Sequence, residues 1–235
     1  MVKSVGENNN ISNSAIIHDG VIIGDNNFIG DNVIIYPNTI IGNNNKIFNG
    51  NIIGEFAINA SIGWDDYDLS KCKGVLIGND NMFHIKNIIF SGIENKTFIG
   101  NNNKILGECH IGHDTQIYNK VVLYPRIIIG GYTECLNNSN IGMAVVIHQR
   151  MIIGQYCMIG ANNMVSKHVF PYYITINNKL HRLNSAKLPP DVLQYDIFLK
   201  EIYANFQEKN YEIDKYNLPP SIKDELSLFI NKLTH

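Results

Sequence analysis

The sequence predicts an all-β parallel β-helix followed by a small α-helical domain. Three observations lead to this prediction. A large apolar residue recurs at every sixth position through most of the chain, and a glycine often follows it. The pattern stops after Val165, and from about Pro189 the apolar residues take helical spacing instead. These features together indicate stacked β-coils with a helical end.

The period of six covers positions 5–53, 77–89 and 99–165. An α-helix repeats every 3.6 residues and a simple strand every two, so neither produces this period. Six residues accommodate one short strand and one tight turn, with one aliphatic side chain pointing inward. Three repeats then close a triangular coil, whose corners suit glycine and asparagine because both tolerate left-handed backbone angles.

The two interruptions of the period predict loops that leave the coil, near 59–76 and 90–98. Such excursions from a rigid solenoid are common places for binding residues. Pro190 with Asp191, and Pro220 with Ser221, are typical of helix starts. We therefore expect a β-helix over 1–175 and a helical cap over 176–235, which would cover the open edge of the last coil.

Composition argues against several classes of function. The net charge is −2 and no basic run is present, which argues against a nucleic-acid partner. No apolar stretch approaches the roughly 20 residues that span a bilayer, and the N-terminus lacks the apolar core of a signal peptide. The four cysteines have neither metal-type nor disulfide-framework spacing, which fits a reducing compartment. We expect a cytoplasmic protein without a membrane span.

The segment 107–114 contains the densest group of candidate catalytic side chains. Ile111 points into the coil, so its neighbour His110 faces outward, while His113 and Asp114 lie at or near a corner. A histidine can accept a proton near neutral pH, and an adjacent carboxylate can orient its ring. Spacing alone leaves a second interpretation open, in which these are exposed polar residues without a catalytic role.

The motifs resemble those of the UDP-N-acetylglucosamine acyltransferase family of hexapeptide-repeat proteins, over nearly the whole chain. The matches are H-x-x-H-D at His110, His113 and Asp114, H-Q at His148 and Gln149 followed by I-I-G, and V-x-P-Y-x-I from Val169 to Ile174. The resemblance implies a left-handed coil and a homotrimer, neither of which follows from the spacing.

The resemblance also implies roles for individual residues. His113 would be the general base, Asp114 its partner, and Gly131 the backbone donor to the oxyanion. The implied substrate-binding residues are Asp68, His110, Tyr132, His148 and Gln149. No bound cofactor and no metal are implied. The acyl donor would be a co-substrate, either acetyl-CoA or an acyl carrier protein.

Departures from the family pattern concern the acceptor contacts. Tyr132 stands where the family usually has histidine, and Pro189 and Pro190 replace a basic pair that contacts the nucleotide diphosphate. From Lys179 onward the chain has eight Lys or Arg and eight Asp or Glu, so no net basic face is expected for a carrier protein. These departures favour N-acetylation of a nucleotide-linked amino-deoxy sugar by acetyl-CoA. The alternative is O-acylation of UDP-N-acetylglucosamine from an acyl carrier protein.

Two other classes of function are weaker alternatives. A zinc hydratase on the same type of coil needs three converging histidines, typically with two of them five residues apart, and His110 and His113 are three apart. A noncatalytic scaffold would have no use for an intact H-x-x-H-D motif together with Gly131.

Overall fold

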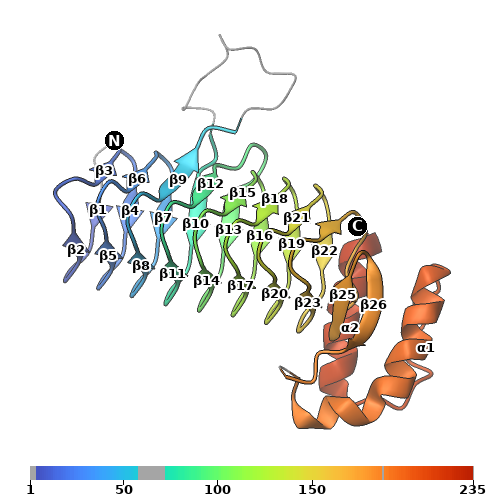
Figure 1. The fold of residues 1–235 in the computed structure, drawn as a ribbon. Helices are drawn as coiled ribbons and strands as arrows, with labels where there is room; N and C mark the ends of the chain where they lie inside the picture. The colour runs from blue at the N-terminus through green and yellow to red at the C-terminus, as the bar shows by residue number, and fades with distance from the viewer. Residues whose placement is uncertain (1–3, 58–71, 187, 235) are drawn as a thin grey trace.

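The computed structural model describes residues 4–57, 72–186 and 188–234. It is a three-sided parallel β-helix with two α-helices at its C-terminal end (Figure 1). Each coil contributes one short strand to each of three parallel sheets, which we call sheets A, B and C. The repeat predicted these stacked parallel coils, and the family resemblance predicted the left-handed β-helix that they form.

The strands follow the six-residue repeat. Sheet A contains β1 (Ser4–Val5), β4 (Ile22–Ile23), β7 (Ile40–Ile41), β10 (Val75–Ile77), β13 (Thr97–Ile99), β16 (Gln116–Ile117), β19 (Glu134–Cys135) and β22 (Ile152–Ile153). Sheet B contains β2 (Asn10–Ile11), β5 (Phe28–Ile29), β8 (Lys46–Ile47), β11 (Met82–Phe83), β14 (Lys104–Ile105), β17 (Val122–Leu123), β20 (Asn140–Ile141), β23 (Met158–Ile159), β25 (Tyr173–Ile176) and β26 (Lys179–Leu183). Sheet C contains β3 (Ile16–Ile17), β6 (Ile34–Ile35), β9 (Ile52–Glu55), β12 (Ile88–Phe90), β15 (His110–Ile111), β18 (Ile128–Ile129), β21 (Val146–Ile147) and β24 (Met164–Val165).

The core of the coil is a stack of the repeated apolar side chains. Ile29, Ile35 and Ile47 are 0% exposed, and their equivalents in the later coils are buried in the same way. Burial of one such side chain contributes about 1.5–3 kcal/mol, so the stack supplies most of the stability of the solenoid. The inward orientation predicted for these positions is therefore confirmed.

A ladder of asparagines, buried except at its first rung, runs along the corner between sheets A and B. The Oδ1 atom of Asn45 accepts hydrogen bonds from the backbone N–H and the Nδ2 of Asn81, both at 3.0 Å. The Nδ2 of Asn45 donates to Oδ1 of Asn27 at 3.1 Å and to the carbonyl of Gly78 at 2.9 Å. The rungs, in chain order, are Asn9, Asn27, Asn45, Asn81 and Asn103. The sequence pattern indicated asparagine as a turn residue and did not predict this second role.

We expect Asn45→Ala to lower the free energy of unfolding by about 2–4 kcal/mol, because buried donors and acceptors on both sides lose their partner. Urea denaturation followed by circular dichroism measures the change. Asn13→Ala, at an exposed turn, is the matched control and should change stability by less than about 0.5 kcal/mol. Equal effects of the two substitutions would contradict a stabilising role for the ladder.

The C-terminal part covers the last coil (Figure 1). The antiparallel hairpin β25–β26 extends sheet B beyond β23 and was not predicted. A 3₁₀-helix (Pro190–Tyr195) follows, then α1 (Asp196–Gln207) and α2 (Pro220–Thr234). The predicted start at Pro190 is therefore that of a 3₁₀-helix, and α1 begins six residues later. A second apolar cluster, which includes Phe170, Leu199 and Phe229, joins the helices to the coil. Among the described residues, no helix is long and apolar enough to cross a membrane.

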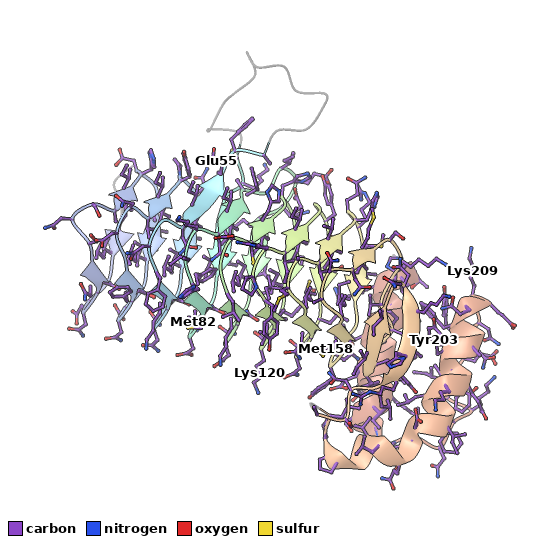
Figure 2. All side chains as sticks on the ribbon, viewed as in Figure 1. Glu55, Met82, Lys120, Met158, Tyr203 and Lys209 are labelled. Carbon is purple, nitrogen blue, oxygen red and sulfur yellow. The ribbon has the colours of Figure 1, made fainter. Side chains whose placement is uncertain are left out.

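The corner where the chain passes from sheet C to sheet A positions the candidate site. Both long excursions leave the coil here, one between β9 and β10 and the other between β12 and β13. We call the residues of the second excursion, 91–96, the second loop. Figure 2 shows Glu55, the last residue of β9, on the side of the coil opposite Met82 of sheet B. Successive coils place residues 18 positions apart above one another at this corner, about 4.8 Å apart.

Candidate functional site

A histidine–aspartate pair lies at the C-to-A corner, directly after β15. Nδ1 of His113 is 2.9 Å from Oδ2 of Asp114. The His113 side chain is 22% exposed and that of Asp114 only 2%. Because a carboxylate only accepts hydrogen bonds, Nδ1 of a neutral His113 carries the hydrogen and Nε2 keeps its lone pair. The pair therefore has the arrangement of a general base with an orienting carboxylate.

The second loop encloses the carboxylate of Asp114. Oδ2 accepts the backbone N–H of Ile93 at 2.8 Å, and Oδ1 accepts those of Glu94 at 3.0 Å and Asn95 at 2.7 Å. The backbone N–H of Asp114 donates to Oγ1 of Thr97 at 2.9 Å. The carboxylate is thus held by three consecutive amides, a concave arrangement that favours negative charge. These residues were not among the predicted site residues, because their contribution comes from the backbone.

Gly131 lies one coil beyond His113 at the same corner. A methyl group added to Gly131 would lie 2.8 Å from both Cε1 and Nε2 of His113. The glycine therefore brings the backbone close to the unbonded nitrogen of the imidazole, where a reacting carbonyl would lie.

The amide of Gly131 lacks the asparagine partner that the equivalent amides have at several A-to-B corners. Two residues after the inward isoleucine, the N–H groups of Asp25, Asn43 and Asn101 each donate to an asparagine Oδ1 of the next coil at 2.7 Å. Within the described part of the chain, the N–H of Gly131 has no such partner, because the residue above it is Gln149 rather than asparagine. An unpaired amide at this position can donate to the oxyanion of an acyl-transfer intermediate.

Tyr132 packs against the imidazole. The ring centroids of Tyr132 and His113 are 5.0 Å apart at an interplanar angle of 88°. The guanidinium of Arg150 lies 4.2 Å from the centroid of the tyrosine ring, and the tyrosine hydroxyl donates to Oε1 of Glu94 at 3.0 Å. Partial burial and the bond to Glu94 raise the pKa of Tyr132, so the hydroxyl remains a donor. Glu94 and Arg150 were not among the predicted site residues.

The remaining predicted residues surround this centre at different distances along the coil. His110 is exposed on the outer face of sheet C, with its ring 4.7 Å from that of Phe90, and partial burial lowers its pKa. His148 and Gln149 are exposed one coil beyond Gly131 at the same corner, and Nδ1 of His148 lies 3.2 Å from the carbonyl oxygen of Gln149. The predicted substrate contact Asp68 lies outside the described residues.

An open groove of about 570 Å³ begins beside the pair and extends over sheet A. Asp114 and Tyr132 line the end of the groove that lies at the corner. Phe98, Gln116 and Glu134, from successive strands of sheet A, line its floor. In the described residues, no group of three His, Cys, Asp or Glu side chains could hold a metal ion. The positions of His113 and Gly131 suit proton transfer and oxyanion stabilisation.

Known proteins with similar sequences are acyltransferases. No family model matches the chain. The acyl-[acyl-carrier-protein]–UDP-N-acetylglucosamine O-acyltransferase of Helicobacter pylori is 25% identical over 189 residues, which are 73% of this chain and 70% of the relative. The enzyme of the same name from Nautilia profundicola is 33% identical over 119 residues, 48% of this chain and 46% of the relative. The match to this second relative therefore spans less than half its length.

The fold agrees with the same group. The crystal structure of a UDP-N-acetylglucosamine acyltransferase from Bacteroides fragilis superimposes with a TM-score of 0.83 at 24% identity, covering 96% of this chain and 91% of that one. The six-residue repeat, the histidine–aspartate pair beside Gly131 and these similarities all indicate the same type of protein. The chain is therefore a left-handed parallel β-helix whose sequence and fold are similar to those of UDP-N-acetylglucosamine acyltransferases.

Proposed function

We propose that the protein transfers an acyl group from an acyl carrier protein to a hydroxyl of UDP-N-acetylglucosamine, with His113 as general base. The observation that carries this proposal is the joint placement of His113, Asp114 and Gly131. The backbone of Gly131, whose N–H has no partner in the described part of the chain, lies beside the Nε2 edge of His113. These two groups are what the attack of a hydroxyl on a thioester requires.

The proposed reaction assigns one task to each group. Nε2 of His113 removes the proton as the sugar oxygen attacks the thioester carbonyl, and the new C–O bond forms. The N–H of Gly131 donates to the resulting oxyanion. The C–S bond then breaks, and the imidazolium returns the proton to the leaving thiolate. Asp114 stabilises the imidazolium between these steps.

The choice of donor and acceptor departs from the one that the sequence favoured. The sequence departures at Tyr132, Pro189 and Pro190 favoured acetyl-CoA and an amino sugar. The curated relatives instead carry the name of an O-acyltransferase that uses an acyl carrier protein and UDP-N-acetylglucosamine. Tyr132 also has partners within the chain, Glu94 and Arg150, so its presence does not require a different acceptor. The relatives therefore support the alternative better.

A direct comparison of substrates tests this choice. We expect kcat/KM for UDP-N-acetylglucosamine with an acyl carrier protein donor to exceed that for acetyl-CoA with a UDP-linked amino-deoxy sugar by about 10²-fold or more, since a site shaped for one donor loses the binding energy of the other. Mass spectrometry of the products distinguishes ester from amide. A faster amide-forming reaction would overturn the proposed donor and acceptor and would leave acyl transfer itself intact.

The outer face of sheet C supports the homotrimer that the family resemblance implies. Its outward side chains form an apolar ladder in register on either side of His110. Ile16, Ile128 and Met164 are 53%, 48% and 62% exposed in the single chain. Sheet B instead presents polar residues such as Lys46 and Lys104. An apolar face of this length is typical of an interface, and its occupant here would be a second copy of the chain.

We expect the protein to be a stable trimer by light scattering at micromolar concentration, and Ile128→Glu to weaken it, because a charge would be buried between copies. Val122→Glu, on the outer face of sheet B, is the matched control and should leave the trimer intact. A monomer with full activity would contradict the proposal.

Trimer formation also bears on the acceptor site, because it would place a second copy against His110. We propose that His110, Tyr132, His148, Gln149 and Asp68 contact the sugar nucleotide. Cys109, Cys135 and Cys157 are buried free thiols, as suits a reducing compartment, and we propose the cytoplasm as the location.

A further inference from the structure

The second loop is fastened to the coil on two sides. Its Gly92 pairs with Gly74, through the N–H of Gly92 donating to the carbonyl of Gly74 at 3.1 Å. A methyl group on Gly92 would lie 1.5 Å from the carbonyl oxygen of Asn95, so the turn requires glycine. Nζ of Lys96 donates to the carbonyls of Asn38 and Lys73, both at 2.7 Å. The loop therefore has a defined shape when it meets Asp114.

Tyr132 connects this loop to the imidazole from the other side. Its hydroxyl donates to Glu94, whose backbone N–H donates to Asp114. Its ring contacts His113, and its backbone N–H donates to the carbonyl oxygen of His113 at 3.0 Å. The contacts therefore form a closed circuit: Tyr132 to Glu94, Glu94 to Asp114, Asp114 to His113, and His113 back to Tyr132. Arg150 fixes the outer face of the tyrosine.

We propose that Tyr132 is a positioning residue, which with Glu94 locks the second loop over Asp114 and so keeps the hydrogen of His113 on Nδ1. This inference rests on the proposed function only in assigning His113 as the base. A tyrosine suits this role because its hydroxyl reaches beyond the imidazole edge to Glu94. Loss of the lock would let the three amides leave Asp114, and the carboxylate could then turn away from Nδ1.

The consequence concerns which nitrogen carries the hydrogen. A neutral histidine without an oriented acceptor distributes its hydrogen between Nδ1 and Nε2. Each molecule with the hydrogen on Nε2 lacks the lone pair that accepts the substrate proton. A loosened lock should therefore lower kcat more than it raises KM. Tyr132→Phe keeps the aromatic ring proposed to contact the sugar nucleotide, and Glu94 is not among the proposed contacts, so Glu94→Ala should leave KM nearly unchanged.

Nitrogen-15 NMR of histidine-labelled, substrate-free protein tests the proposal, with the His113 signals assigned by their absence from His113→Asn. We expect the Nδ1–H form to dominate in the wild type and the Nε2–H form to rise in Tyr132→Phe and Glu94→Ala. We also expect kcat to fall about 10-fold in each, and no further in the double variant, because the two side chains share one hydrogen bond.

Two further variants distinguish loss of the Tyr132–Glu94 hydrogen bond from a general loss of stability. Glu94→Gln keeps an acceptor oxygen and should retain the wild-type spectrum and kcat. Tyr173→Phe removes a comparable bond, from a tyrosine hydroxyl to Oδ1 of Asp196 at 2.7 Å, far along the chain, and should change neither. Unchanged His113 signals in Tyr132→Phe and Glu94→Ala would overturn the proposal. The NMR result stands even if the wild type transfers no acyl group, so failure of the proposed function would be recognised separately.

Discussion

We expect His113→Ala to lower kcat by about 10²–10⁴-fold, the usual contribution of a general base. Nε2 of His113 is the basic nitrogen next to Gly131, and its orientation is set by Asp114. The side chain is only partly exposed at a corner and does not belong to the apolar core, so its loss should leave the fold and the oligomeric state unchanged. Steady-state kinetics with the carrier-protein donor, together with circular dichroism, measures both.

His18→Ala is the matched control for this substitution. His18 follows β3 at the same type of corner, where its ring stacks on Tyr36 with centroids 4.9 Å apart. We expect full activity from this variant, and a smaller loss from His110→Ala than from His113→Ala, because His110 would act on positioning. If His113→Ala retains more than about a tenth of the wild-type kcat, the base lies elsewhere.

Much of the fold was predictable because one physical requirement repeats. Every coil needs an inward aliphatic residue and corner residues that tolerate a positive φ, and both needs are visible in the sequence. Asn26, Asn44 and Asn102, for example, have φ of +58° to +59° at the A-to-B corner of three different coils. The hairpin β25–β26 was not predictable in the same way, because it occurs once in the chain and its residues follow no repeated pattern.

The site was predictable only in part. His110, His113 and Asp114 stand close together in the sequence, and their residue types suggest proton transfer. The support of Asp114 comes instead from backbone amides of the second loop, 19 to 21 positions away in the chain. Every residue except proline has a backbone N–H, so residue type does not show which of these groups will bind a carboxylate. Glu94 and Arg150 were missed for a related reason, since their roles depend on the path of a loop and on the stacking of coils.

Gly131→Ala should be nearly as damaging as loss of the base, with a fall in kcat of about 10²-fold or more. The added methyl group would lie 2.8 Å from Nε2 of His113, closer than such atoms approach, so the imidazole must move. That movement separates the base from the amide that would bind the oxyanion. Gly131 is not among the residues with positive φ, so alanine introduces no backbone strain that would unfold the coil.

Gly160→Ala is the control, because its methyl group would lie 3.1 Å from the side chain of Asn163, 3.2 Å from that of Ile176 and 3.8 Å from the nearest backbone atom, all longer than the 2.8 Å contact at Gly131 and far from His113 along the coil. The double variant His113→Ala/Gly131→Ala distinguishes the cause of the loss. If the methyl group acts by displacing the imidazole, the double variant should be little worse than His113→Ala, since the clash no longer exists. If the two losses multiply fully, the methyl group acts on the oxyanion amide independently of the base, and displacement of His113 is not the explanation.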